Sequence, residues 1–256
     1  MTHTTSIVGN FFQKKVAIVT GGAQGIGFAV ADRLCDLGAF VYILDKSIVK
    51  TNSERSLSIA CDLTSEDSVI SAFNAISMKS PKIDIVCANA GIVPEWATTE
   101  SIDLASWNEA FAINSTGLML TIKHSVPLFG TGSGAIVVTG SINSWKGDPN
   151  IAAYVASKHA ALGIIRATAM DLGSKGIRVN GVGPGPIATD ALLNRISNRR
   201  GITGLSATVT LENLAKATAL HRIATVEDVV STIIFLASDA SAGITGQLIP
   251  VDCGVF

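Results

Sequence analysis

Val16-Ala-Ile-Val-Thr-Gly-Gly-Ala-Gln-Gly-Ile-Gly27 lies close to the amino end of the chain. A short apolar run with β-branched residues is followed by glycines and then by a helical pattern, which is the order of a strand, a tight turn and a helix. Glycines at such a turn let the backbone approach a pyrophosphate, whose negative charge faces the amino end of the helix. The stretch therefore predicts a dinucleotide site, with candidate contacts at Gly21, Gln24, Gly25, Ile26 and Gly27.

The same alternation of strand-like and helix-like segments continues to the end of the chain. The strand-like runs are Val16 to Thr20, Phe40 to Leu44, Ile83 to Ala88, Ala135 to Thr139, Ile177 to Val182 and Leu248 to Val251. The helix-like segments are Gly25 to Leu37, Glu66 to Met78, Leu104 to Leu128, Ala152 to Leu172 and Val226 to Ala237. The pattern predicts an α/β protein with a doubly wound parallel sheet, a Rossmann fold, in one domain over residues 1–256. Residues 1–14 form an amino-terminal extension in this interpretation, and residues 190–222 form a helical lid over a substrate pocket.

An acidic residue, Asp45, ends the second strand-like run, eighteen residues beyond Gly27. A carboxylate there accepts hydrogen bonds from the adenosine ribose and repels a 2′-phosphate, which favours NAD over NADP. The neighbouring Lys46 argues the other way, and a solvated turn aspartate is the plain alternative. Polar residues fill most of the chain up to Cys61, so a helix before the third strand is short or absent. Asp62, at the end of that strand, either caps the next helix or reaches the adenine, together with Leu63.

A tyrosine and a lysine stand four residues apart in Tyr154-Val-Ala-Ser-Lys158, inside a predicted helix. Residues at this spacing share one helix face. The ordinary pKa of tyrosine is near 10, so a phenol that acts as a base near neutral pH needs its pKa lowered by about 2 to 3, and a nearby cation can do this. The run Ala135 to Gly140 delivers Ser141 to the same crevice. An ordinary amphipathic helix is the alternative for the pair alone.

Composition excludes several classes of function. The 256 residues carry a net charge of −1, with 19 basic and 20 acidic side chains mixed along the chain, so no broad attraction to nucleic acid or anionic lipid is expected. No apolar run is long enough to cross a bilayer, and the polar start predicts a cytoplasmic protein. Only 15% of the residues are charged and the mean hydropathy is +0.44, which favours a homo-oligomer. The isolated cysteines and histidines indicate reduced thiols and no metal site.

Taken together, these motifs resemble the short-chain dehydrogenase/reductase family over nearly the whole chain. The glycine motif from Thr20 to Gly27 is similar to the family's cofactor signature. Asn89-Ala90-Gly91 is similar to the motif after its fourth strand. The catalytic tetrad of the family corresponds to Asn114, Ser141, Tyr154 and Lys158. The loop that holds the nicotinamide corresponds to Pro184, Gly185, Ile187 and Thr189, and further matches follow at Phe235 to Asp239 and Thr245-Gly246.

The resemblance implies a role for each of these residues. Tyr154 is the general base in alcohol oxidation and the acid in carbonyl reduction, and Ser141 hydrogen-bonds the reacting oxygen. Lys158 lowers the phenol pKa and binds the nicotinamide ribose, and Asn114 holds a water that links Lys158 to solvent. Taken one at a time, these residues also have structural interpretations. Asn114 could be a buried asparagine that bends its helix, Ser141 a helix cap and Thr189 the N-cap of the lid.

The chain departs from the family pattern at two places. Cys253 stands where a glycine is frequent, so the backbone near the carboxyl end is expected to differ slightly. The shortened segment after Asp45 leaves the adenine side more open. Neither departure touches the tetrad.

The expected substrate is a small alcohol or ketone, and the resemblance implies a homotetramer. We expect the pocket to be lined by Ser141, Asn143, Trp145, Tyr154, Glu95 and Trp96, which are mostly polar and favour a sugar, sugar acid or polyol. Arginines in the lid, Arg195, Arg199 and Arg200, are possible carboxylate partners, or else form a solvated helix face. The leucines and isoleucine of the lid equally permit a cyclic or aromatic alcohol. The alternatives are an NADPH-dependent 3-oxoacyl carrier-protein reductase and a non-catalytic dinucleotide-binding scaffold.

Overall fold

A parallel sheet of seven strands forms the centre of the protein, as the computed structural model shows for residues 11–51, 53–130, 132–189, 192–193, 196–197 and 206–255. The strand order is β3-β2-β1-β4-β5-β6-β7, with all neighbours parallel. The strands are β1 Val16–Thr20, β2 Phe40–Asp45, β3 Ser56–Ala60, β4 Ile85–Ala88, β5 Gly134–Thr139, β6 Ile177–Pro184 and β7 Leu248–Val251. The chain reverses its direction across the sheet between β3 and β4, which creates a crevice at the carboxyl ends of the strands. The predicted doubly wound fold is confirmed.

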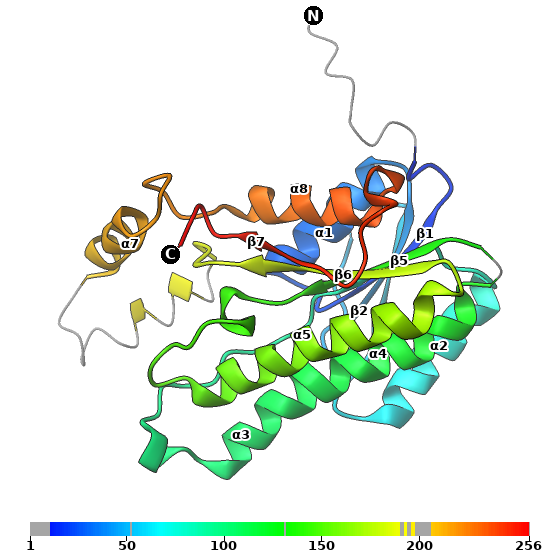
Figure 1. The fold of residues 1–256 in the computed structure, drawn as a ribbon. Coiled ribbons are helices and arrows are strands. Elements are labelled where there is room, and N and C mark those ends of the chain that lie inside the picture. The colour runs from blue at the N-terminus through cyan, green and yellow to red at the C-terminus, as the bar shows by residue number, and fades with distance from the viewer. Residues whose placement is uncertain are drawn as a thin grey trace, which may run out of the picture.

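Helices cover both faces of the sheet (Figure 1). One face carries α1 (Gly25–Asp36) and α8 (Val226–Ala237), and the other carries α2 (Glu66–Lys79), α3 (Leu104–Phe111), α4 (Leu118–Ser125) and α5 (Ala152–Gly173). A further helix, α7 (Ala207–Lys216), lies beyond β6 in the region predicted as a lid. Residues 190–191, 194–195 and 198–205 of the predicted lid lie outside the described part of the chain, as do residues 1–10 of the predicted extension.

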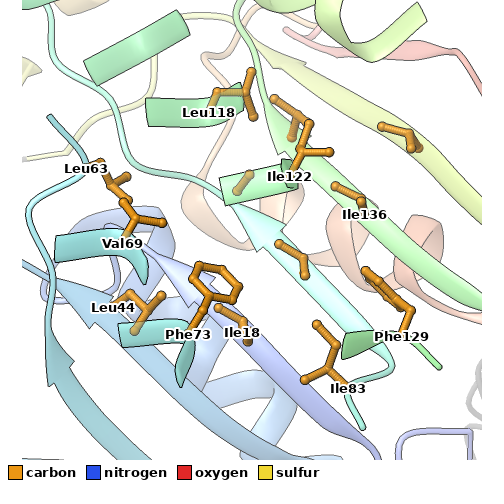
Figure 2. Close-up of a cluster of buried hydrophobic side chains, with 14 of the residues drawn as sticks. Ile18, Leu44, Leu63, Val69, Phe73, Ile83, Leu118, Ile122, Phe129 and Ile136 are labelled. Carbon is orange, nitrogen blue, oxygen red and sulfur yellow. The ribbon is translucent and has the colours of Figure 1, made fainter. Parts of the chain in front are cut away.

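Strand residues alternate between two hydrophobic clusters, one under each helix layer. In β1, Ile18 belongs to the cluster beneath α2, α4 and α5, whereas Ala17 and Val19 belong to the cluster beneath α1 and α8. Figure 2 shows the first cluster, which contains Ile18 of β1 and Phe73 of α2. Because both faces are buried, the strands read as continuous apolar runs, and this is why sequence alone located most of them.

One predicted helix, Leu104 to Leu128, is wrong as a continuous element. The structure divides it into α3, a π-helical turn over Ala112–Gly117, α4 and a short 3₁₀ turn over Val126–Leu128. Asn114 lies in the π turn, where its side chain bonds to the loop after β4, which agrees with its interpretation as a residue that distorts its helix. Pro127 lacks an N–H group and falls in the turn that ends the segment.

The strand expected before Asp62 is β3, and its limits could not be read from an apolar run. Ser56 and Ser58 alternate with Leu57 and Ile59, as befits a half-buried strand at the edge of the sheet. No helix occurs between β2 and β3 among the described residues 46–51 and 53–55, as expected. The other element limits agree with the predicted ones to within two residues.

The carboxyl-terminal segment contains a non-glycine residue in the left-handed region. Cys253 has a φ of +58°. A side chain disfavours this conformation, which explains physically why a glycine is suited to the position. The four cysteines are free thiols. Within the part of the chain that the structure describes, no helix has both the length and the apolar character to span a membrane.

Candidate active site

A cleft of about 810 Å³ opens at the carboxyl ends of the strands. The turns after β1, β2, β3, β4, β5 and β6 all contribute to its walls, as expected for the crevice of a doubly wound sheet. Most residues predicted to bind the cofactor line this cleft: Gly21, Gln24, Gly25, Ile26, Asp45, Asp62, Leu63, Asn89, Ala90, Gly91, Tyr154, Lys158, Pro184, Gly185, Ile187 and Thr189. Ser141 lines it as well.

The glycine turn after β1 is closed against the loop after β4. A side chain on Gly27 would collide with the Gly21 carbonyl oxygen and the Asn89 amide, so Gly27 holds the turn together without lining the cleft. The Asn89 amide nitrogen donates to Gly21 O at 3.2 Å, and Thr139 Oγ1 donates to Asn89 Oδ1 at 3.0 Å. Asn89 therefore braces the turn from the neighbouring strand.

The turn and helix α1 suit a pyrophosphate. Gly25 has a φ of +57°, and a side chain placed on it would meet no atom within 4 Å, so the open space beside it belongs to the cleft. The N-cap residue of α1, Gln24, makes no capping hydrogen bond with its side chain, and no acidic residue lies in the first turn. The N–H groups at the start of α1 are therefore available to an anion.

Charged side chains at the ends of two adjacent strands lie on the wall of the cleft where the adenosine is predicted to bind. We call this set the adenine rim and define it as Asp45, Lys46 and Asp62. Asp45 accepts hydrogen bonds from Ala23 N at 3.1 Å and Ser47 N at 3.2 Å. Lys46 Nζ lies 3.4 Å from Asp62 Oδ2. Asp62 does not cap helix α2, because Ser65 is its N-cap.

Among the described charged residues that line the cleft, Lys158 is the most deeply buried. It is 5% exposed, and its Nζ donates to Thr139 O at 2.9 Å. Burial lowers the pKa of the Lys158 ammonium to about 8. Its Nζ lies 5.7 Å from the centroid of the Tyr154 ring, so the predicted pair does share one side of α5.

Asn114 organises the backbone beside this pair. Its amide nitrogen donates to Ile92 O at 2.9 Å and to Ser157 Oγ at 3.0 Å, and its Oδ1 accepts from Ile92 N at 2.8 Å. Ser157 Oγ donates in turn to Tyr154 O at 2.8 Å. A side chain on Gly91 would lie 3.2 Å from Asn114 Oδ1 and 3.3 Å from Lys158 Nζ, so Gly91 keeps open the space between these two groups.

Ser141 is both a helix cap and a cleft residue. Its Oγ accepts from Asn143 N at 3.1 Å, and its own N–H donates to Ser144 Oγ at 3.2 Å. This capping box fixes the hydroxyl, whose hydrogen is then free in direction to meet an oxygen in the cleft. Thr189 also fits both of its predicted roles. Its Oγ1 accepts from Leu192 N at 3.4 Å, as an N-cap does, and the residue lines the cleft.

A smaller share of the residues predicted to bind substrate lines the cleft than of those predicted to bind the cofactor. Within the described chain, Asn143, Trp145, Glu95 and Trp96 are not part of the cleft wall, and Asn114 stands behind it. Asn143 is buried, and its amide nitrogen donates to Asp148 at 3.5 Å. Trp145 is 44% exposed. Arg195, Arg199 and Arg200 lie outside the described residues. No group of metal-ligating side chains occurs in the described chain.

Several residues of the site were not anticipated from the sequence. Thr139 accepts from Lys158 through its carbonyl oxygen and donates to Asn89 through its hydroxyl, and Ser157 links Asn114 to Tyr154. Ser157 does lie in the same five-residue run as Tyr154 and Lys158, which is the one signal that could have identified it. Further lining residues are Leu44, Cys61, Ile92, Val93, Glu109, Ile113, Gly140 and Pro186.

Comparisons with known proteins show which family the chain belongs to. A family model described as enoyl-(acyl carrier protein) reductase matches residues 21–256. The chain is 34% identical to cis-4-hydroxycyclohexanecarboxylate dehydrogenase of Sinomonas cyclohexanicum, over 96% of this chain and 98% of the relative.

Solved structures of dehydrogenases are similar to this chain over nearly its full length. The structure of aldohexose dehydrogenase from Thermoplasma acidophilum has a TM-score of 0.88 and 29% identity, over 95% of this chain and 94% of the other. Carveol dehydrogenase from Mycobacterium avium, solved in complex with NAD, has a TM-score of 0.86 and 27% identity, over 95% and 98%. The sequence match over almost the full length of both proteins identifies the chain as a member of the short-chain dehydrogenase/reductase family.

Proposed function

We propose that the protein is an NAD-dependent dehydrogenase that interconverts a secondary alcohol and a ketone. The observation that carries this proposal is a single cleft with Tyr154, Lys158 and Ser141 at one end and the Asp45 carboxylate at the other. Nicotinamide dinucleotides have a reactive ring at one end and an adenosine ribose at the other, and this cleft offers suitable groups to both.

In this proposal, the proton of the alcohol hydroxyl goes to Tyr154. NAD bound in the cleft would supply the hydride acceptor; the substrate carbon would lose a hydride and its oxygen a proton, so that alcohol and NAD⁺ balance ketone, NADH and H⁺. Ser141 donates a hydrogen bond to the reacting oxygen. Lys158 uses one N–H on Thr139 O, and its charge favours the ionised phenol while its other N–H groups serve the ribose. In carbonyl reduction, Tyr154 returns the proton.

The preference for NAD rests on Asp45. Its carboxylate lines the cleft where β2 ends, held by the N–H groups of Ala23 and Ser47. A 2′-phosphate brought to this position meets a negative charge, whereas ribose hydroxyls can donate to it. The relative from Mycobacterium avium was solved with NAD, which supports the same choice.

The substrate proposal keeps two candidate classes. A small hydroxylated compound such as a sugar, sugar acid or polyol is the first, in line with the polar residues around Ser141 and with the similarity to an aldohexose dehydrogenase. A cyclic alcohol is the second, and Trp145 favours it. A side chain on Gly183 would lie 2.6 Å from the Trp145 ring and 3.3 Å from Ser141 O, so the 44% exposed indole, although not part of the cleft wall, lies close to the Ser141 backbone. The similarity to a hydroxycyclohexanecarboxylate dehydrogenase supports this class.

The test is an NAD reduction screen, read by absorbance of NADH, over sugars, sugar acids, polyols and cyclic alcohols. We expect turnover with NAD to exceed turnover with NADP at equal concentration. Preference for NADPH with a 3-oxoacyl carrier-protein thioester would instead support the reductase alternative. Binding of NAD without turnover of any alcohol would support a dinucleotide-binding scaffold.

The accompanying variant is Tyr154→Phe, which removes only the phenolic oxygen. We expect it to lower kcat by about a thousandfold, because general acid–base catalysis contributes factors of about 10² to 10⁴. NAD affinity, measured by calorimetry, should change by less than about twofold. Retained turnover would contradict Tyr154 as the base, and a parallel loss of NAD affinity would indicate a damaged cleft.

A further inference from the structure

Lys46 and Asp62 face each other across the adenine rim. Asp45 pairs with Ala60 in the register between β2 and β3, so the residues that follow these strands emerge side by side. Lys46 Nζ is 3.4 Å from Asp62 Oδ2, and both residues line the cleft. The adenine rim therefore contains the Lys46 ammonium next to Asp45, and this ammonium is already paired with the Asp62 carboxylate.

Lys46 is the cation with access to a phosphate at this end of the cleft. Among the described residues that line the cleft, the cationic side chains are Lys46 and Lys158. Lys158 is buried at the catalytic end, where it donates to Thr139 O. Among the described residues of the cleft wall, Lys46 is thus the one whose charge could neutralise a 2′-phosphate on a ribose beside Asp45.

Asp62 is held in a fixed orientation by the residue two positions on. Its Oδ1 accepts hydrogen bonds from Thr64 N at 2.9 Å and Thr64 Oγ1 at 2.7 Å. These bonds leave Oδ2 directed at Lys46 and lower the pKa of the Asp62 carboxyl, so the carboxylate stays charged at neutral pH. Asp62 is thereby a permanent competitor for the Lys46 ammonium.

We propose that Asp62 is a second specificity-determining residue, which holds the Lys46 ammonium and so withholds from a 2′-phosphate its cationic partner. Asp45 repels the phosphate directly, and Asp62 acts through the lysine that would otherwise offset this repulsion. This inference rests on the proposed use of NAD and explains how the chain keeps a lysine beside Asp45 without gaining a phosphate site.

The test uses adenosine halves of the cofactors, so that binding is separated from turnover. ADP-ribose and its 2′-phosphorylated form are titrated by calorimetry into the full chain, at low and at physiological salt. Asp62→Asn is the informative variant, because Asn keeps an oxygen acceptor for Thr64 while its amide group releases Lys46. Asp62→Asn/Lys46→Gln and Lys46→Gln complete the cycle.

The matched control is Asp67→Asn in the first turn of α2. It removes the same charge from an exposed residue that is not among those lining the cleft. The two rim side chains that are changed are partly exposed, 58% for Lys46 and 41% for Asp62, so these variants should fold.

We expect Asp62→Asn to bind the 2′-phosphorylated probe about threefold to fivefold more tightly than the wild type, with a smaller change for ADP-ribose. The gain should vanish in the double variant, shrink at higher salt, and be missing in Asp67→Asn. A gain that persists without Lys46 would overturn the proposal, since Asp62 would then repel the phosphate directly. Equal weakening of both probes would also overturn it, because Asp62 would then be a contact to the adenine.

The proposed use of NAD is tested separately, by which of the two probes the wild-type protein prefers. If the wild type prefers the 2′-phosphorylated probe, the proposal of NAD as cofactor fails, whatever the variants do. If the wild type prefers ADP-ribose and Asp62→Asn changes nothing, the cofactor proposal stands and the role of Asp62 fails.

Discussion

The two ends of the cleft hold their lysines in opposite ways. Lys158 is 5% exposed and lies in a network of buried hydrogen bonds with Thr139, near Asn114 and Ser157. Lys46 has a side chain that is 58% exposed and is held by a single ion pair. A buried polar network fixes geometry and makes every member costly to remove, whereas an exposed pair contributes little to stability and can be exchanged. We therefore expect the Lys158 end, which we propose to be catalytic, to be the more rigid one, and the adenine rim to be the part where specificity can change.

The largest effect should come from breaking the buried network at Asn114. Asn114→Ala leaves Ile92 N, Ile92 O and Ser157 Oγ without this partner, so we expect the free energy of unfolding to fall by about 2 to 4 kcal/mol. Urea denaturation measures the loss. The matched control is Asn143→Ala, another buried asparagine, whose amide makes one long bond to Asp148. Equal losses in the two variants would contradict the special role of Asn114.

The next effect concerns the burial of the Lys158 charge and depends on pH. The pKa of Lys158 is lowered to about 8 in the folded protein, while an unfolded lysine keeps its ordinary value of 10.5. Between these values the unfolded state binds more protons, so wild-type stability should rise with pH relative to Lys158→Met. The gain from pH 7 to pH 10 should be on the order of 3 kcal/mol at most.

Urea denaturation of both proteins at several pH values checks this dependence. Both proteins also carry Tyr154→Phe, because the Lys158 charge favours the ionised phenol and the titration of Tyr154 would otherwise differ between them. The titrating groups away from Lys158 are shared by the two proteins and cancel in the difference. A difference that stays flat across this range would show that burial does not depress the Lys158 pKa.

The contrast between the two ends also explains what the sequence could predict. Strand β1 and the turn from Gly21 to Gly27 were identified because burial on both faces and the need for glycine impose a local pattern. Tyr154 and Lys158, which line one cleft in the structure, were predicted from their spacing on a helix, which is local too. The end of the cleft that we propose to be catalytic is thus recognisable from short runs of residues.

The remaining features depend on contacts between distant segments. The π turn at Asn114 goes with hydrogen bonds to Ile92, twenty-two residues away, and no helical pattern contains this information. Likewise, the pairing of Lys46 with Asp62 depends on the register between β2 and β3, and β3 itself has a half-polar pattern. The interaction of the rim residues could therefore be seen only in the structure.

A smaller effect is expected on cofactor choice from Asp45→Asn. Asn keeps an oxygen for the N–H groups of Ala23 or Ser47 and removes the charge that opposes a 2′-phosphate. The ratio of kcat/KM for NAD to that for NADP should fall about tenfold, which corresponds to about 1.4 kcal/mol. Steady-state kinetics with both cofactors measures the ratio. An unchanged ratio would show that Asp45 does not face the adenosine ribose.

The smallest effect, and the sharpest contrast with Asn114, is on the stability of the rim. Lys46→Gln removes the ion pair with Asp62, yet the free energy of unfolding should change by less than about 0.5 kcal/mol, because exposed pairs gain little over their hydrated groups. Lys123→Gln is the matched control, since Lys123 pairs with Glu66 at 56% and 44% exposure. A loss above about 1 kcal/mol for Lys46→Gln alone would mean that the pair supports the fold. The Lys46 ammonium would then not be exchangeable between Asp62 and a ligand, and the rim would be as rigid as the catalytic end.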